Sequence, residues 1–377
     1  MLPPLSLYIH FPWCVRKCPY CDFNSHQQKA DLPETAYVAA LLADLDADLQ
    51  RLNTPRPLQS IFMGGGTPSL FSAAALQQLL DGIRQRLTLS EACEITLEAN
   101  PGTVESAKFK AYRALGINRL SMGIQSFNDQ HLQRLGRIHS ADEAQQAITL
   151  AIEAGFDNFN LDLMFCLPEQ TPAQALADVA TALRFKPTHL SFYQLTLEPN
   201  TYFYKFPPKL PEDEQIFAAQ KAGQQLLASQ GYLQYEVSAY AKSGFQSRHN
   251  RNYWQFGDYL GIGAGAHGKL SQQLPTGILR TAKPKSPEQY LTKTIPGSRE
   301  SIAIEQLPLE FVMNHLRLKQ GFNLDDFERL TGLSAAALQP ALNVCLTQGL
   351  LVKQGAQVCC SEQGWDFLDL ILEKFMP

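Results

Sequence analysis

The stretch CVRKCPYC, residues 14–21, places Cys14, Cys18 and Cys21 in one short loop behind the apolar segment LSLYIHF (5–11). Three thiols this close bind a metal group, react with one another or have no shared role. Eight cysteines scattered over 377 residues are too few for a disulfide scaffold. In a reducing compartment, clustered thiols are more often metal ligands or catalysts. The loop therefore predicts a metal centre directly after a first strand.

Two kinds of metal centre compete for this loop. A structural zinc ion needs four nitrogen or sulfur ligands, and His26 is available as a fourth. The C-x3-C opening is unusual for zinc, however, and no second pair of ligands lies nearby in the sequence. An iron–sulfur cubane also takes four ligands, usually thiolates. Unless folding brings in a distant cysteine, three thiolates leave one iron open to a small molecule.

Strand-like and helical segments alternate through the first two-thirds of the chain. This alternation predicts βαβ units and a parallel sheet. Six units predict an open, partial (βα)6 barrel of the TIM type, because a complete eight-unit barrel typically takes about 250 residues. The expected strands are 5–11, 60–66, 94–100, 119–126, 159–165 and 189–197, and the expected helices are 34–52, 72–87, 103–115, 140–154 and 171–184.

Polar residues gather where these strands end, namely Cys14, the segment GGGTP (64–68), Glu98, Gln125 and Asp162. In parallel α/β barrels the carboxyl ends of the strands form the active face. Glycines beside a three-thiolate cluster indicate that backbone approaches a ligand closely, which only glycine permits. The amino and carboxylate groups of a methionine can chelate an open iron, and S-adenosylmethionine carries both.

The last part of the chain has a different pattern. Helices are expected at 212–230, 308–319, 324–331, 334–349 and 364–375, with a hairpin at 350–360. Residues 301–377 therefore predict a small, mainly helical, winged-helix-like domain, after a barrel core at 1–230 and a connecting region at 231–300. Nine acidic and five basic residues in 301–377 oppose DNA binding.

Overall composition narrows the function classes. The net charge is −4 and the pI is about 6.1, so no overall electrostatic attraction to nucleic acid or to an anionic membrane is expected. No run of about 18 apolar residues predicts a membrane-spanning helix. The start MLPPLSLYIHF lacks the features of a signal peptide. We expect a cytoplasmic protein.

Taken in order, six motifs resemble the radical S-adenosylmethionine superfamily and, within it, the coproporphyrinogen dehydrogenase-like branch with its haem-chaperone (HemW-type) family. These motifs are YIHFPWCVRKCPYC (8–21), GGGTPS (64–69), EANPGT (98–103), GIQSF (123–127), LGRIH (135–139) and NLDLMFCLP (160–168). The resemblance runs through nearly the whole chain. It implies that Cys14, Cys18 and Cys21 hold a [4Fe–4S] cluster whose open iron takes S-adenosylmethionine.

The resemblance also implies roles for residues around the cofactor. Tyr8 matches a position that contacts S-adenosylmethionine, and the segment Gly65, Gly66, Thr67 matches the part that binds its methionine amino end. The matching polar positions are Glu98, Gln125, Arg137 and Asp162. Each alone is equally an ordinary salt bridge or core residue. His10 is expected beside the cluster.

Two functions of different class follow from the resemblance. One is oxygen-independent coproporphyrinogen III dehydrogenase, an enzyme that decarboxylates propionates. The other is a haem chaperone, which delivers haem to acceptor proteins such as respiratory enzymes. Phe23 stands where the dehydrogenase has a further cysteine, and only residues 1–4 precede the first strand, where it has a long extension. These features favour the chaperone. A radical enzyme with another substrate stays open, because Glu98, Gln125, Arg137 and Asp162 are retained and haem carriage alone needs no adenosyl site. A homodimer and peripheral contact through membrane-bound acceptors are further expectations.

The motif HNRNYW (249–254) looks like a haem-chaperone signature. A histidine imidazole is a common axial ligand of haem iron, so His249 is the candidate haem ligand. Tyr253 and Trp254 can pack flat against a porphyrin. The alternative is a loop histidine beside core aromatics. His267, between glycines, is a weaker second candidate.

Cys166 departs from the pattern, because relatives usually have glycine there. We expect a buried small hydrophobic residue, with an additional metal ligand as the alternative.

Overall fold

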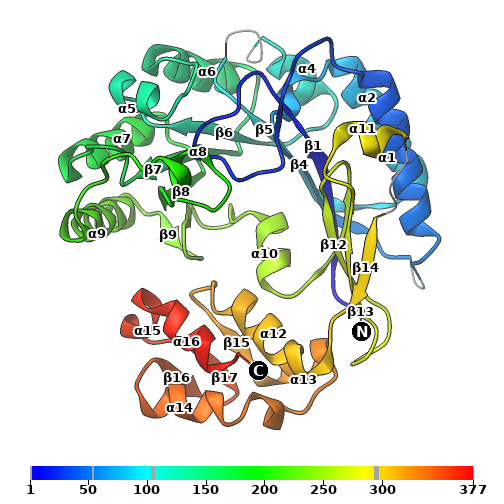
Figure 1. The fold of residues 1–377 in the computed structure, drawn as a ribbon, viewed down its shortest axis with the longest axis vertical. Helices are drawn as coiled ribbons and strands as arrows, with labels where there is room; N and C mark the ends of the chain where they lie inside the picture. Colours follow the sequence, from blue (N-terminus) through cyan, green and yellow to red (C-terminus); the bar gives the residue numbers. More distant parts are fainter. Residues whose placement is uncertain (1, 53–54, 103–106, 293–296, 377) are drawn as a thin grey trace.

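The computed structural model describes residues 2–52, 55–102, 107–292 and 297–376. Six parallel strands form its centre in the order β1-β4-β5-β6-β7-β8 (Figure 1). They are β1 Leu5–Phe11, β4 Leu58–Gly65, β5 Leu89–Ala99, β6 Arg119–Gln125, β7 Phe159–Phe165 and β8 His189–Gln194. The partial barrel predicted from the strand–helix alternation is confirmed.

Helices follow these strands and cover the outer face of the sheet (Figure 1). They are α1 Glu34–Leu49, α2 Ala73–Arg86, α4 Phe109–Ala114, α5 Asp129–Arg134, α6 Ala141–Glu153 and α7 Pro172–Arg184. Residues 103–106 of the expected helix 103–115 lie outside the described residues. Capping boxes at Ser140 and Thr171 begin α6 and α7, because each side chain satisfies a backbone N–H of the first turn.

The apolar core lies between the sheet and these helices, whereas the inside of the barrel is polar. On β6, Leu120 and Met122 are fully buried in the core. The alternate residues Arg119, Ser121 and Gln125 line an internal cavity. Successive side chains of a strand point to opposite faces, so this alternation repeats around the barrel. The interior is therefore available for ligands.

Both edges of the sheet carry strands from residues 231–301. The strand β11 (Asp258–Ile262) pairs parallel with β1, and the antiparallel strands β12 His267–Ser271, β13 Ile278–Ala282 and β14 Ser298–Ser301 follow it. At the other edge, β10 Ala239–Ala241 and β9 Leu233–Gln234 continue from β8. The three-part division of the chain stays a prediction.

The C-terminal part packs around its own apolar cluster, which Phe256 and Ile278 join. It contains α12 Leu307–His315, α13 Leu324–Thr331, α14 Ala341–Thr347, α15 Glu362–Asp366 and α16 Leu368–Lys374, with β15 Phe322–Asn323 beside the hairpin β16 Leu351–Gln354 and β17 Gln357–Cys360. The hairpin was predicted. The single helix expected at 334–349 was wrong, because Gln339 is extended before Pro340 and α14 begins only afterwards.

The remaining elements connect these layers. They are β2 Trp13–Cys14, β3 His26–Gln27, η1 Pro68–Leu70, α8 Tyr202–Lys205, α9 Asp213–Ser229, α10 Arg248–Trp254, α11 Pro287–Thr292, η2 Ile304–Gln306 and η3 Ala335–Leu338. The helix α10 lies between the barrel and the C-terminal part (Figure 1). In the part of the chain that the structure describes, none of the helices has the length and apolar character to cross a membrane.

Candidate functional site

A cavity of about 830 Å³ occupies the interior of the barrel. It extends from the cysteine loop to α10 and the C-terminal part. Its walls include the predicted residues Cys14, Cys18, Cys21, Gly65, Gly66, Thr67, Glu98, Gln125, Arg137 and Asp162. The structure therefore brings together ten of the twelve predicted site residues. Tyr8 and His249 are not among the lining residues.

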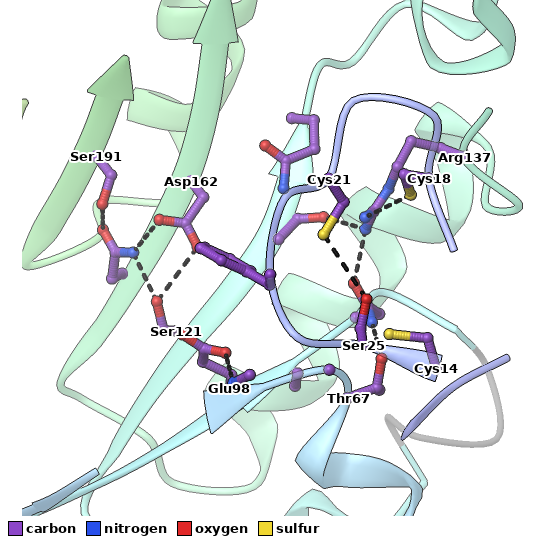
Figure 2. A pocket seen from close by; sticks show the side chains of 18 of the residues that line it. Cys14, Cys18, Cys21, Ser25, Thr67, Glu98, Ser121, Arg137, Asp162 and Ser191 are labelled. Carbon is purple, nitrogen blue, oxygen red and sulfur yellow. Dashed lines mark hydrogen bonds between the residues drawn. The ribbon is translucent and has the colours of Figure 1, made fainter. Parts of the chain in front are cut away.

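Pairing of β2 with β3 closes the cysteine loop at the carboxyl end of β1. Inside the loop, the Cys21 N–H donates to the Cys18 carbonyl at 3.1 Å, and Lys17 Nζ donates to the Phe23 carbonyl at 3.1 Å. All three thiols are free and half-buried, and Figure 2 shows them at one side of the cavity. Burial is the main reason why the pKa of Cys14 and of Cys21 is raised.

The glycine segment after β4 is bonded to the cysteine loop. The Gly66 N–H donates to the Phe11 carbonyl and the Thr67 N–H to the Trp13 carbonyl, each at 2.7 Å. A Cβ atom on Gly66 would lie 2.5 Å from the Trp13 oxygen. Gly65 has a φ of +109°, and its Cβ would lie 2.4 Å from the His10 ring. The glycines thus permit a close approach of protein to protein at this point.

Two carboxyl groups face the cavity beyond the cysteines (Figure 2). Glu98 Oε2 accepts from the Gly65 N–H at 3.0 Å. Burial, and secondly the charge of Asp162, raises the pKa of Glu98 to about 8. Asp162 accepts from Asn160 Nδ2 at 2.8 Å and from Ser121 Oγ at 3.3 Å, and burial raises its pKa. This pair can hydrogen-bond the hydroxyl or amino groups of a ligand.

Arg137 connects the strand ends to the cysteine loop. Its Nη2 donates to Asn100 Oδ1 and to the Gly123 carbonyl, each at 2.7 Å, and its Nη1 lies 3.8 Å from Cys18 Sγ. Its Nε is buried without a hydrogen-bond partner among the described residues. Gln125 has a φ of +69° and accepts from the Tyr193 hydroxyl at 2.7 Å. Both side chains present polar atoms to a ligand at the cysteine end.

Tyr8 and His10 support the loop from behind the cavity wall. The Tyr8 hydroxyl lies 2.9 Å from His10 Nδ1, and His10 Nε2 lies 2.8 Å from the Asn24 carbonyl oxygen. Burial lowers the pKa of His10. This hydrogen-bonded chain fixes Asn24 in the cysteine loop. His10 thus lies beside the loop, as expected.

The signature HNRNYW forms most of α10. Of its members, Asn250 and Trp254 line the cavity. The His249 imidazole is buried, with Nδ1 2.9 Å from Ser60 Oγ and Nε2 2.8 Å from the Tyr253 hydroxyl. Burial lowers the pKa of His249 to about 3. Ligation of haem by His249 therefore requires one ring nitrogen to leave its hydrogen-bond partner, and this role stays a prediction.

The remaining candidates lie away from the cavity walls. His267 is exposed at the start of β12, and His26 Nε2 lies 3.3 Å from the Lys285 carbonyl oxygen. Cys166 is buried, does not line the cavity and has a φ of +63°. That left-handed conformation favours glycine, the residue that the resemblance implies for this position. Burial raises the pKa of Cys166 to about 11, as for an inert thiol.

Three charged residues at the other end of the cavity were not predicted. Arg119, Glu236 and Arg317 line it together with Trp254. The Arg317 guanidinium lies 4.4 Å from the Trp254 ring centre and 3.7 Å from Glu236 Oε2. For Arg119, the sequence contained a usable signal, because Arg119 and Gln125 are an even number of residues apart on β6 and therefore face the same side of the sheet. No local pattern connects Glu236 or Arg317 to the barrel.

The cysteine end fits a [4Fe–4S] cluster. Among the described residues, no three metal-ligating side chains converge on a single ion position, and a cluster does not require this, because each thiolate binds a different iron. The other five cysteines do not line the cavity. The guanidinium of Arg137 lies beside Cys18, with Nη1 3.8 Å from Sγ. Three thiolates and one open iron therefore suit the donors present.

Comparison with known proteins agrees with this arrangement. Residues 8–181 match the Radical SAM superfamily, and residues 303–367 match the HemN C-terminal domain. A solved Escherichia coli coproporphyrinogen III oxidase, HemN, described as a radical SAM enzyme, has the same fold. It superposes with a TM-score of 0.83 at 22% identity, covering 99% of this chain and 90% of that one.

Two full-length relatives are more similar in sequence. The heme chaperone HemW of Haemophilus influenzae is 52% identical over 100% of this chain and 98% of its own. The heme chaperone HemW of Escherichia coli is 49% identical over 100% of this chain and 99% of its own. Identity at this level over whole chains shows common membership of a family. The chain belongs to the HemW family of the radical S-adenosylmethionine superfamily.

Proposed function

We propose that this protein is a haem chaperone, which binds haem and transfers it to haem-dependent acceptor proteins. The observation that carries the proposal is the single cavity that connects the cysteine loop with α10 and the C-terminal part. One ligand site near the cysteines and a second near Trp254 fit into that space. Acceptors of the respiratory-enzyme class, a cytoplasmic location and a homodimer belong to the same proposal.

The superfamily implies a [4Fe–4S] cluster and S-adenosylmethionine. In the proposal, Cys14, Cys18 and Cys21 hold three irons of the cluster. Glu98 and Asp162 form hydrogen bonds with S-adenosylmethionine. Arg137 holds the cysteine loop against the strand ends. When bound, the cluster supplies one-electron reduction. The residues around it orient the ligand and restrict access of water through the half-buried loop.

A second candidate function is oxygen-independent coproporphyrinogen III dehydrogenase. The observation in its favour is that Glu98, Gln125, Arg137 and Asp162 all line the cavity, although haem carriage alone needs no adenosyl site. Against it, Phe23 occupies the position of the dehydrogenase's further cysteine. Its side chain is 58% exposed at the mouth of the cavity.

One anaerobic experiment separates the two functions. The cluster is reconstituted, S-adenosylmethionine and reductant are added, and the protein receives haem in one sample and coproporphyrinogen III in another. The chaperone proposal expects a saturable haem absorbance spectrum and no decarboxylation. Formation of protoporphyrinogen, at catalytic turnover, would replace it by the dehydrogenase.

The variant His249→Ala tests the haem ligand within this proposal. If a ring nitrogen of His249 leaves Ser60 or Tyr253 to bind iron, the variant loses the haem absorbance band of a histidine complex and binds haem at least about tenfold more weakly. The iron–sulfur absorbance stays, because the hydrogen bonds of His249 go to Ser60, Glu94 and Tyr253, which lie outside the cysteine loop. His267→Ala is titrated in parallel. Loss of the band in that variant alone would transfer the role to His267.

A further inference from the structure

The end of the cavity far from the cysteines contains a buried cation that forms no ion pair with any described residue. Arg119 is the first residue of β6 and is 2% exposed. Its Nε has no hydrogen-bond partner among the described residues, and none of the ion pairs found there includes Arg119. Burying a charge is costly unless it is paired and hydrogen-bonded. Such a group in a cavity wall therefore indicates an absent partner.

Two further buried donors line the same cavity without an acceptor in the described part of the chain. They are Trp254 Nε1 on α10 and Arg317 Nε after α12. Indole and guanidinium nitrogens donate and do not accept. The complement of such a set is an anion with several acceptor atoms. Arg317 already pairs with Glu236, so Arg119 is the cation left to receive it.

The nearby carboxyl groups do not replace this partner. The charge of Arg119 acts to lower the pKa of Glu98 and of Asp162, but this is a minor effect, and neither carboxyl forms an ion pair with Arg119. Burial raises the pKa of both carboxyls by a larger effect. Glu98, whose pKa is raised to about 8, is therefore a weak counter-ion near neutral pH, and Asp162 accepts hydrogen bonds from Asn160 and Ser121 instead.

We infer that this end of the cavity is a carboxylate subsite built on Arg119. The guanidinium fork matches a carboxylate in two parallel hydrogen bonds. A strand rises about 3.3 Å per residue, so Arg119 lies roughly 20 Å along β6 from Gln125 at the cysteine end. A methionine carboxylate that chelates the cluster cannot reach it. The carboxylate belongs to a second, larger ligand inside the barrel.

The inference rests on the proposed function, because that function supplies the ligand. Haem carries propionates, and so does coproporphyrinogen, the substrate of the second candidate function. The shared chemistry is a tetrapyrrole propionate. Arg119 anchors it at the amino end of β6, and Trp254 lines the same cavity.

The test titrates wild-type protein, Arg119→Gln and Arg119→Lys with three probes, namely haem, haem dimethyl ester and coproporphyrin III. Arg84→Gln, an exposed arginine paired with Asp81 on α2, is the control for loss of one charge. We expect Arg119→Gln to bind haem at least about tenfold more weakly, since hydrogen bonds to charged groups are the strong ones. The wild type should bind the ester as weakly, and Arg119→Gln should weaken ester binding no further.

The probes separate the outcomes. If Arg119→Gln loses affinity for haem alone, or for coproporphyrin alone, that tetrapyrrole is the one whose propionate Arg119 binds. If wild-type protein binds coproporphyrin through Arg119 but no haem, the subsite stands and the chaperone proposal falls. Unchanged affinities in a folded Arg119→Gln overturn the subsite, as does a wild type that binds neither tetrapyrrole. If Arg119→Gln does not fold, the test uses Arg119→Lys and the comparison of haem with its dimethyl ester in wild-type protein. Equal affinity of the wild type for haem and for the ester then overturns the carboxylate subsite.

Discussion

Glu98 and Asp162 show how burial inside this barrel changes the pKa of single side chains. Both are carboxyls on inward-facing strand positions, and burial raises the pKa of each. A group with a raised pKa keeps its proton where a free carboxyl has lost it. Glu98 is thus suited to donate a hydrogen bond near neutral pH, which an ordinary glutamate does not do.

The pKa of Glu98 predicts a pH-dependent stability. An unfolded glutamate ionises near 4.5, whereas folded Glu98 keeps its proton up to about pH 8. Between these values folding must retain a proton, so Glu98 increasingly destabilises the protein as pH rises. Glu98→Gln removes this effect and keeps an acceptor for Gly65. We expect it to raise the free energy of unfolding by about 1–3 kcal/mol at pH 8, with little change at pH 4.5.

Thermal unfolding of the apo protein at both pH values measures this difference. Glu91→Gln, at an exposed position of the same strand, is the control. An equal shift of Glu98→Gln at both pH values would mean that packing and not ionisation is responsible.

Single residues also show what the sequence could and could not predict. The thiols, the glycine segment and the strand-end polar residues were predicted because local spacing places them on one rim. Tyr8 and His249 have the expected residue types, but their partners His10, Ser60 and Tyr253 turn them away from the cavity. Those contacts depend on packing between distant segments, which local pattern does not contain.

The connection between β1 and β4 decides how the cysteine loop is held. Two backbone hydrogen bonds join the end of β4 to Phe11 and Trp13 on either side of Pro12. Gly66 lies where these segments touch. The sequence predicted glycines close to a ligand, and the structure adds that Gly66 is needed for contact with backbone of the loop itself.

Gly66→Ala should therefore disturb the cysteine loop. Its Cβ would lie 2.5 Å from the Trp13 oxygen, a backbone atom that cannot move independently. We expect a loss of about 1–3 kcal/mol in the free energy of unfolding and a reduced iron content after reconstitution. The measurements are chemical denaturation and iron and sulfide analysis.

Gly155→Ala is the matched control for this element. Gly155 has a φ of +85° with nothing within 4 Å of an added Cβ. It tests backbone strain of about 1–2 kcal/mol without a clash. An equal loss of iron in both variants would show that global stability, and not the loop, limits cluster binding.

At the scale of the whole molecule, the barrel and the C-terminal part share residues. Phe256 and Ile278 come from the region before residue 300 and pack in the C-terminal apolar cluster. Arg317, from the C-terminal part, lines the barrel cavity. The sequence predicted both parts but not that residues of each part contact the other. The sequence around Arg317 or Phe256 does not indicate a contact partner so far along the chain.

Phe311→Ala tests whether these contacts couple the two parts. Phe311 is fully buried, with its ring 5.7 Å from Phe256, 5.4 Å from Phe322 and 5.1 Å from Phe327. Removing such a ring costs about 3–5 kcal/mol. We expect faster hydrogen exchange in α12 and α13 and also in β13, which contributes Ile278. Because Arg317 follows α12, tetrapyrrole affinity should fall as well. Phe367→Ala, at a 54% exposed phenylalanine, is the control and should change neither. Faster exchange confined to the C-terminal helices, with unchanged affinity, would mean that the two parts respond independently and that the cavity does not depend on the C-terminal core.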